Sequence, residues 1–212
     1  MQALLLDLDW TLIDIQGHTD YGAALEDART LVGQWSEPGA PDTSWDAPAR
    51  ICMEALVALA GDARWQALSD SIEHHELAAV PRSRPMTGLG DLIDAVADTP
   101  VAVVTLVGPD AARRALETHA VPFTTVVGRR HDLRPKPAPD QLIEACRLLG
   151  VSRSDATMVG DSTWDMEAAR AAGTGFIGIT NHRPSEFPSA TATVADLAEL
   201  SHHLPSPASP RR

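Results

Sequence analysis

The chain has 212 residues, of which 44% are hydrophobic, and its formal net charge is −12 at pH 7. This length provides one core of ordinary size and a modest insertion, and it excludes two full catalytic domains. No apolar run approaches the roughly 18 residues of a membrane span, and no basic stretch followed by an apolar one opens the sequence. The negative charge leaves no basic surface for a phosphate backbone, which argues against nucleic acid as a partner and favours a small ligand.

The cysteine and lysine content narrows the class further. Cys52 and Cys146 lie far apart, with neither the density of a secreted disulfide scaffold nor the spacing of a zinc site. We therefore expect reduced thiols in a cytoplasmic protein that is not exported. Lys136 is the one lysine among 17 basic residues. The oligomeric state stays open at this level.

Five short apolar runs predict the strands of the fold. The first spans residues 3–8, interrupted only by Asp7, and it reads as a strand buried on both faces of a parallel sheet. The others span residues 101–105, 124–127, 156–159 and 175–179. Helical patterns lie between them, over residues 110–119, 140–149 and 163–172. This alternation predicts an α/β fold with a three-layer, Rossmann-like parallel sheet, which binds ligands beyond the carboxyl ends of its strands.

Residues 15–85, called the insertion below, break this alternation because they show helical patterns and no strand-like run. A loop over 33–45 is expected between two of its helices. The core domain would then comprise residues 1–14 and 86–204, and the proline-rich tail 205–212 is expected to be disordered. The insertion has five arginines and no lysine against 11 acids. Polyanionic substrates would be repelled unless one of these arginines faces the cleft.

Two aspartates follow the first strand directly. Asp7 is placed at the carboxyl end of that strand, and Asp9 lies just beyond it in the loop. One carboxylate can attack phosphorus as a nucleophile, while the other protonates the leaving oxygen and later activates water. Taken alone, such a pair more often begins a turn or caps a helix than forms a catalytic site.

A second acidic motif, Gly160-Asp161-Ser162 followed by Asp165, ends the fourth strand and opens a helix. Magnesium takes oxygen ligands and usually only one or two carboxylates, so Asp161 and Asp7 could bind it together. The alternative is that Asp161 or Ser162 is the helix N-cap and Asp165 a first-turn acid that the helix dipole favours.

Lys136 and Thr105 complete the candidate residues. Lys136 stands between prolines just before a helix, where a rigidly held ammonium can neutralise a nucleophilic carboxylate and a transferring phosphoryl group. A solvated surface lysine is the alternative, but a surface position in this chain would more often carry arginine. Thr105 ends the second strand, where its hydroxyl and the following backbone N–H groups can hold phosphate oxygens.

In this order along the chain, the residues resemble the motifs of the haloacid dehalogenase superfamily. Its phosphatases carry D-x-D-x-T, a strand-ending Ser or Thr, a Lys before a helix, and G-D-x-x-x-D. The resemblance extends over residues 3–179, and the insertion lies where that family places an α-helical cap. Phosphoglycolate phosphatases and β-phosphoglucomutases are the most similar in layout.

The resemblance implies a magnesium-dependent reaction with defined roles for the acids. Asp7 would be the nucleophile that forms an aspartyl-phosphate, and Asp9 the acid/base that also offers its backbone carbonyl to the metal. Asp161 would be a further metal ligand. Asp165, with Ser162 beside it, would orient metal-bound water or the lysine. The implied substrate is a small phosphorylated metabolite.

The resemblance implies Thr105 and Lys136 as stabilisers of the phosphate and its charge, and we expect Thr11, Leu106 and Trp10 to contact the substrate or its phosphate beside them. Two of these positions depart from the family pattern. Trp10 stands where Gly is usual, so we expect an ordinary negative φ there and an indole that narrows or lines the pocket, or packs in the core. Leu106 replaces a common Asn, which keeps the backbone N–H and removes a side-chain contact.

Three rival functions remain open at the level of sequence. A haloacid dehalogenase proper attacks carbon and needs neither a second aspartate nor a metal, so Asp9 and Asp161 argue against it. A phosphomutase acting on a sugar phosphate uses the same residues and differs in excluding water. The chain could also be a binding module that kept the fold and lost turnover.

Overall fold

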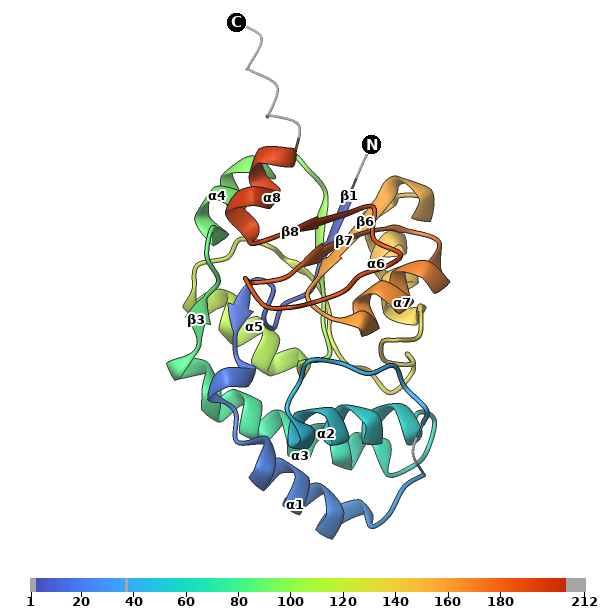
Figure 1. Cartoon of the computed structure of the whole chain (residues 1–212). Helices are drawn as coiled ribbons and strands as arrows, with labels where there is room; N and C mark the ends of the chain where they lie inside the picture. Colours follow the sequence, from blue (N-terminus) through green and yellow to red (C-terminus); the bar gives the residue numbers. More distant parts are fainter. Residues whose placement is uncertain (1–2, 37, 205–212) are drawn as a thin grey trace, which may run out of the picture.

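The computed structural model describes residues 3–36 and 38–204 (Figure 1). The tail that the sequence predicts to be disordered, 205–212, lies outside the described residues. No helix within the described ranges is both long enough and apolar enough to cross a membrane.

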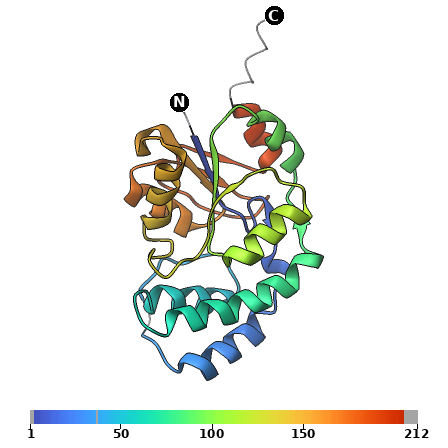
Figure 2. The same ribbon diagram turned by 180° about the vertical axis from the view of Figure 1, so that it is seen from behind.

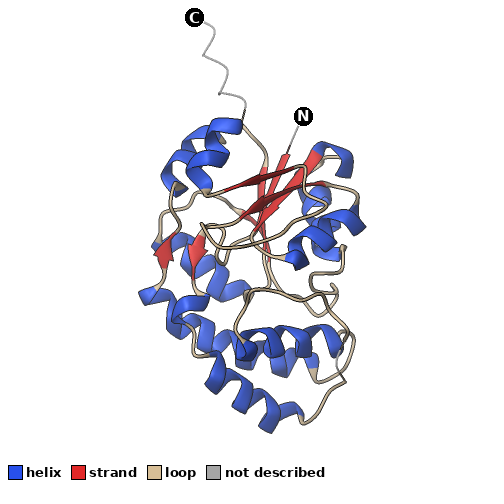
Figure 3. Cartoon of the chain, in the orientation of Figure 1, coloured by secondary structure: helices blue, strands red, loops and turns tan. Residues whose placement is uncertain are grey.

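A six-stranded parallel sheet forms the centre of the larger part of the molecule (Figure 3). Its order is β5 (Thr125–Val127), β4 (Val101–Val104), β1 (Ala3–Leu6), β6 (Ala156–Gly160), β7 (Gly175–Ile179) and β8 (Ala192–Val194). Five of these strands lie where the sequence predicts them. The sixth, β8, was missed because only Val194 of its three residues is buried, so it has no apolar run.

Helices cover both faces of this sheet, which confirms the predicted three-layer α/β fold. One face packs against α4 (Leu89–Ala95), α5 (Pro109–Thr118) and α8 (Leu197–His203), and the other against α6 (Asp140–Leu149) and α7 (Thr163–Ala172). The alternation of β1 shows the division, because Leu4 and Leu6 belong to the first apolar cluster and Leu5 to the second. A short 3-10 turn, η3 (Arg153–Asp155), precedes β6.

The insertion begins and ends at a small antiparallel ribbon. In this ribbon β2 (Ile13–Asp14) pairs with β3 (Arg84–Pro85). The intervening elements are η1 (Gln16–His18), α1 (Tyr21–Val32), α2 (Ala47–Ala58), α3 (Trp65–Ala79) and η2 (Val80–Arg82). The loop predicted over 33–45 does separate two helices, α1 and α2. The three insertion helices lie below the sheet in Figure 1.

The insertion has an apolar cluster of its own that reaches the core domain. The cluster includes Leu25, Leu56, Trp65 and Leu68 from the three helices, and it continues into Leu106 and Trp164 at the edge of the sheet. Seen from behind, α3 runs beside α5 (Figure 2). The insertion therefore packs against the carboxyl edge of the sheet, which is the edge where the sequence predicts the site.

Candidate active site

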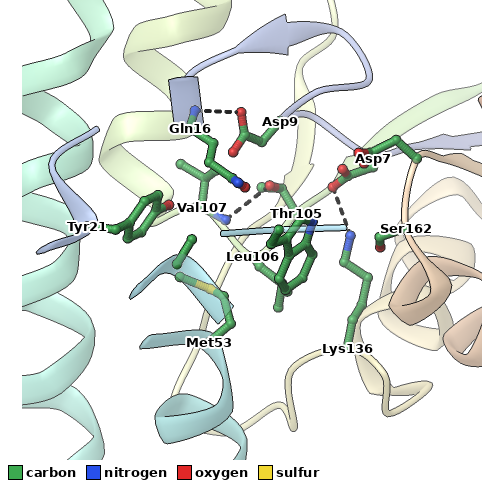
Figure 4. A pocket seen from close by; sticks show the side chains of 13 residues that line it. Asp7, Asp9, Gln16, Tyr21, Met53, Thr105, Leu106, Val107, Lys136 and Ser162 are labelled. Carbon is green, nitrogen blue, oxygen red and sulfur yellow. Dashed lines mark hydrogen bonds and ion pairs between the residues drawn. The ribbon is translucent and has the colours of Figure 1, made fainter. Parts of the chain in front are cut away.

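Three strand ends and one loop bring charged side chains together at this edge (Figure 4). Asp7 follows β1, Thr105 follows β4 and Asp161 follows β6, while Lys136 comes from the loop before α6. The Lys136 ammonium donates to Asp7 Oδ1 over 2.8 Å. Residues separated by more than a hundred positions in sequence thus meet because parallel strands end at one edge.

Lys136 is fully engaged by its surroundings. Its side chain is 2% exposed, and Nζ donates to Asp7 Oδ1 at 2.8 Å, to Asp165 Oδ1 at 2.5 Å and to the Val104 carbonyl at 3.1 Å. These three bonds use all three donors of an ammonium. Burial alone would lower the pKa of Lys136, but the carboxylates of Asp165 and Asp7 outweigh it and hold the pKa above its usual value. The lysine is therefore charged in the folded protein.

Gln141, which sequence analysis missed, fixes the loop that carries the lysine. The Lys136 backbone N–H donates to Gln141 Oε1 over 3.1 Å, and Gln141 Nε2 donates to the Thr105 carbonyl over 2.8 Å. The Gln141 side chain is fully buried in the first turn of α6. One amide thus ties the lysine loop to the end of β4, and a lone Gln in a helical stripe gives no signal of that role in sequence.

Asp165 is held by the start of α7. Ser162 Oγ accepts the Asp165 backbone N–H at 3.2 Å, and Asp165 Oδ2 accepts from the Ser162 hydroxyl and backbone N–H in a capping box. A side chain at Gly160 would place its Cβ 2.5 Å from the Asp165 carboxyl carbon, so glycine is required there. Ser162 is therefore the helix N-cap, as the alternative interpretation of the motif held, and Asp165 is both a first-turn acid in its capping box and a partner of Lys136.

Asp9 is positioned by the first turn of the insertion. Its Oδ1 accepts the backbone N–H groups of Ile15 at 2.8 Å and Gln16 at 2.9 Å. Loss of hydration raises the pKa of Asp9 to about 8, although these two hydrogen bonds lower it. A carboxyl group with such a pKa holds a proton at neutral pH and can act as a general acid.

The other carboxylates crowd one another. Burial raises the pKa of Asp7 to about 7, against the opposing effect of Lys136. Burial, reinforced by the charges of Asp7 and Asp165, raises the pKa of Asp161 well above its ordinary value. Four acids at this edge face a single ammonium, so a cation would relieve their mutual repulsion.

Oxygens of Asp7, Asp161 and Asp165 lie within 4.8 Å of one another, which is close enough for one ion. Asp165 already uses one oxygen on Lys136 and the other on Ser162. In the described part of the chain, by contrast, no hydrogen bond reaches the Asp161 carboxylate. Asp7 and Asp161 therefore fit magnesium, which takes one or two carboxylates. The Asp9 carboxylate lies outside this group, and only its backbone carbonyl would be offered.

Thr105 and Leu106 line a cavity at this edge of the sheet, which Asp7, Asp161 and Lys136 also line. The Thr105 hydroxyl is fully buried and accepts the Val107 backbone N–H over 3.1 Å, which curls the chain after β4. The Leu106 carbonyl accepts a hydrogen bond from Arg129. The backbone N–H of Leu106, in contrast, has no acceptor among residues 3–36 and 38–204. This free N–H is the kind of donor that the sequence predicts for phosphate at this position.

The structure corrects the prediction made for Trp10. Its φ is +57°, in the left-handed region, instead of the ordinary negative value expected. The Arg183 guanidinium lies 3.2 Å from the centroid of the indole, and the Trp10 carbonyl accepts from Asn181. Trp10 does not line the cavity. The segment around Asn181 and Arg183 thus holds the tryptophan in the backbone conformation that glycine would adopt freely.

Thr11, the other substrate contact predicted beside Trp10, also lies away from the cavity. It is fully buried, and its hydroxyl has no partner among the described residues. The remaining predicted residues do line the cavity or touch those that do: Asp7, Asp9, Thr105, Leu106, Lys136, Asp161 and Ser162 line it, and Asp165 lies behind Lys136.

The insertion lines the other side of the cavity. Gln16, Tyr21, Trp45, Ala49 and Met53 form that wall. The space between the two walls measures about 30 Å³. By the same measure one water needs roughly 10–15 Å³, so only a few small groups fit without displacement of side chains.

A buried ion pair joins this wall to the core, and sequence analysis missed it. Glu76 of α3 and Arg129, in the loop after β5, are both buried and share two hydrogen bonds of 2.8 and 3.0 Å. Glu76 also accepts the Gly108 backbone N–H, and Glu73 accepts two N–H groups at the start of α5. An acid within the apolar stripe of a helix signals a buried partner. The sequence does not tell which of many arginines supplies it.

The fold and the site together define a three-layer α/β protein with an acid–lysine centre at the carboxyl edge of a parallel sheet. The sequence model of the family described as haloacid dehalogenase-like hydrolase matches residues 48–179, more than half of the chain. The chain belongs to this family.

Among curated proteins, the chain is similar to two kinds of enzyme over short segments. It is 34% identical over 93 residues to a phosphoglycolate phosphatase of Chromobacterium violaceum, which is 43% of this chain and 40% of that one. It is 39% identical over 74 residues to a protein assigned as a pyrophosphatase, PpaX, of Caldanaerobacter subterraneus subsp. tengcongensis, which is 34% of each chain. The match spans well under half the length of these relatives.

Solved structures share the fold over nearly the whole chain. A hydrolase from Pseudomonas syringae superposes with a TM-score of 0.72 at 21% identity, covering 96% of this chain and 97% of that one. CbbY from Rhodobacter sphaeroides, solved with phosphate, gives a TM-score of 0.70 at 20% identity, covering 94% and 96%. Likeness at this level of identity establishes the architecture alone.

Proposed function

We propose that the protein is a magnesium-dependent phosphatase that hydrolyses a small-molecule phosphate monoester through an aspartyl-phosphate on Asp7. One arrangement carries the proposal. The carboxylate of Asp7 lies 2.8 Å from the Lys136 ammonium, and nearby Asp9 has a pKa of about 8. A nucleophile, a fixed positive charge and a protonated acid are the groups that phosphoryl transfer through an enzyme carboxylate requires.

The proposed reaction has two steps. In the first, an Asp7 oxygen forms a bond to phosphorus while the ester P–O bond breaks, and Asp9 gives its proton to the leaving alkoxide. In the second, Asp9 takes a proton from water as that water attacks phosphorus, which releases phosphate and restores the Asp7 carboxylate. Lys136 holds the Asp7 carboxylate in place and offsets the charge of the phosphoryl oxygens.

Magnesium would neutralise the negative charge that remains on the carboxylates beside Lys136. Asp7 and Asp161 would hold it with their carboxylates, and Asp9 with its backbone carbonyl. When bound, the ion supplies Lewis-acid polarisation of the phosphoryl group. Thr105 and the Leu106 N–H would position the phosphoryl oxygens, and Asp165 would keep Lys136 in place.

We also propose a domain organisation and a location for the chain. Residues 1–14 and 86–204 would act as the catalytic core, and residues 15–85 as a cap over the site. Both cysteines are free thiols, which supports the cytoplasmic location proposed from the sequence. The substrate would be a small phosphorylated metabolite.

The direct test measures phosphate release from a panel of phosphate monoesters by the full chain, with and without magnesium. Asp7→Asn is expected to reduce turnover by at least about a thousandfold, since the amide is not a nucleophile. Asp94→Asn, at an exposed position on α4, is the matched control. Activity that survives Asp7→Asn would refute the proposed nucleophile.

The same assay separates the rival functions. A phosphomutase would return the label of a ³²P-labelled sugar phosphate to the sugar instead of releasing it as free phosphate. A binding module would show no hydrolysis of any ester, including an aryl phosphate, while still binding the ester in the presence of magnesium. Either outcome would replace the phosphatase proposal.

A further inference from the structure

The wall of the cavity that faces the catalytic acids carries no formal charge. The insertion contributes Tyr21, Trp45, Ala49 and Met53, together with the amide of Gln16, and the core adds Leu106 and Val107 (Figure 4). The Tyr21 hydroxyl already donates a hydrogen bond of 3.2 Å to Glu76 Oε1. A leaving group that extends from the phosphate toward the insertion therefore meets mainly apolar side chains and one neutral amide.

The two buried cations near the cavity have no donor to spare. All three donors of Lys136 are bound to Asp7, Asp165 and the Val104 carbonyl. Arg129 lies behind Leu106 and uses five donor bonds, two to Glu76, two to Ser69 and one to the Leu106 carbonyl. A guanidinium has five N–H donors, so Arg129 is saturated as well.

None of the five arginines of the insertion lines the cavity. Arg29 and Arg50 line a separate hollow on the outside of the insertion, and Arg64 pairs with Asp62. Arg82 donates to the His18 carbonyl, and Arg84 lies on the exposed strand β3. The condition under which the acidic insertion would accept a polyanion, an arginine in the cleft, is not met.

The acids on the side of the cavity formed by the core domain, called the core wall below, also disfavour a substrate with a second anionic group. The carboxylates of Asp7, Asp161 and Asp165 face one ammonium, so a divalent ion would only balance these charges, and the transferred phosphoryl group would add further negative charge. A carboxylate or second phosphate on the leaving group would lie near these acids with no free counter-charge among the residues that line the cavity, which is unfavourable.

We infer that the substrate is a monophosphate ester of a small uncharged alcohol, and that the site discriminates against esters with a second anionic group. This inference rests on the proposed phosphatase function. It differs from what the names of the similar curated proteins suggest, because phosphoglycolate and pyrophosphate both carry a second anionic group. Gln16 and Met53 line the cavity on the side of the insertion, so a bulky leaving group that extends in that direction would meet their side chains.

The test compares two esters of nearly equal size, 2-hydroxyethyl phosphate and phosphoglycolate, in which a CH₂OH group replaces a carboxylate. With magnesium, the full chain is expected to show a kcat/KM at least about tenfold higher for the neutral ester. Pyrophosphate is expected to be hydrolysed no better than phosphoglycolate.

A charge placed on the neutral wall sharpens the test. Gln16→Arg puts a cation opposite Thr105 and is expected to raise the kcat/KM ratio of phosphoglycolate to 2-hydroxyethyl phosphate by about tenfold. Gln66→Arg, at an exposed position of α3, adds the same charge away from the cavity and is expected to change the ratio by less than about twofold. Thermal unfolding checks that both variants fold.

The outcomes distinguish this inference from the function on which it rests. A wild-type preference for phosphoglycolate or pyrophosphate overturns the inference and leaves the phosphatase proposal standing. An unchanged ratio in a folded Gln16→Arg variant also contradicts it, because the wall would then not contact the leaving group. Absence of turnover on every ester overturns the proposed function and this inference together.

Discussion

The two walls of the cavity are built in different ways. The core wall places Asp7, Asp161 and Lys136 at strand ends and in a proline-bounded loop, each held by the sheet or by short hydrogen bonds. The insertion wall presents Trp45 and Met53, which belong to or pack against an apolar cluster. The core wall is charged and fixed by geometry, whereas the insertion wall is neutral and fixed by packing.

This difference separates two tasks within one site. Phosphoryl transfer needs charges at fixed positions, because an error of about an ångström in the reacting groups costs orders of magnitude in rate. Selection of a leaving group needs only a wall of suitable shape and charge, and apolar side chains of similar volume can replace one another there at small cost. The walls should therefore respond differently to substitution.

The largest effect is expected at the lysine of the core wall. Lys136→Met leaves Asp7 and Asp165 without their shared counter-charge and should lower kcat by about a thousandfold. Lys136→Arg keeps the charge, but a planar guanidinium cannot reproduce three converging bonds, so little activity should return. Arg134→Gln, at an exposed position two residues away, is the control in the same phosphate-release assay. A Lys136→Met variant with wild-type kcat would contradict the role assigned to the core wall.

The buried ion pair of Glu76 and Arg129 joins the insertion to the core domain. Glu76→Gln leaves a buried guanidinium without its counter-charge and should cost about 3–5 kcal/mol in the free energy of unfolding, measured by urea denaturation. Replacing both residues with Met should recover most of that loss, since no buried charge remains unpaired.

The neighbouring surface pair offers a matched control for this measurement. Asp132→Asn breaks the exposed pair with Arg130 and should cost less than about 1 kcal/mol. If Glu76→Gln proved no more costly than Asp132→Asn, the insertion would not be held to the core by this pair.

A smaller effect, with a pH signature, is expected at Asp9. Because its pKa is raised to about 8, the protonated acid is present at neutral pH and is lost as the pH rises through that value. The kcat/KM for an alkyl phosphate should fall above pH 8 in the wild type. Asp9→Asn should lower it by about a hundredfold at pH 7, and less for p-nitrophenyl phosphate, whose leaving group needs no proton. If Asp9→Asn lowered kcat/KM by the same factor for both esters, Asp9 would have a role other than proton transfer.

Sequence patterns predicted the core wall far better than the insertion wall, for a physical reason. Strand ends are marked locally by an apolar run followed by a polar residue, so Asp7, Thr105 and Asp161 could be placed on one edge. The contact between Glu76 and Arg129 joins residues 53 positions apart and carries no local pattern. Strand β8 was missed for a related reason, since a half-exposed edge strand has no apolar run. Both misses concern positions where tertiary contacts, and not local sequence, decide the structure.

The smallest effect is expected at Trp10, which adjoins the core wall without lining the cavity. Trp10→Gly removes the strain of a positive φ, worth about 1–2 kcal/mol, but it also loses the contact with Arg183, worth about 0.5–1 kcal/mol, and adds chain entropy to the unfolded state. Trp10→Ala loses the same contact and keeps the strain. The glycine variant should therefore be more stable than the alanine variant by about 1 kcal/mol in urea denaturation. Both should keep the wild-type substrate preference, and a change in that preference would mean that the indole reaches the leaving group after all.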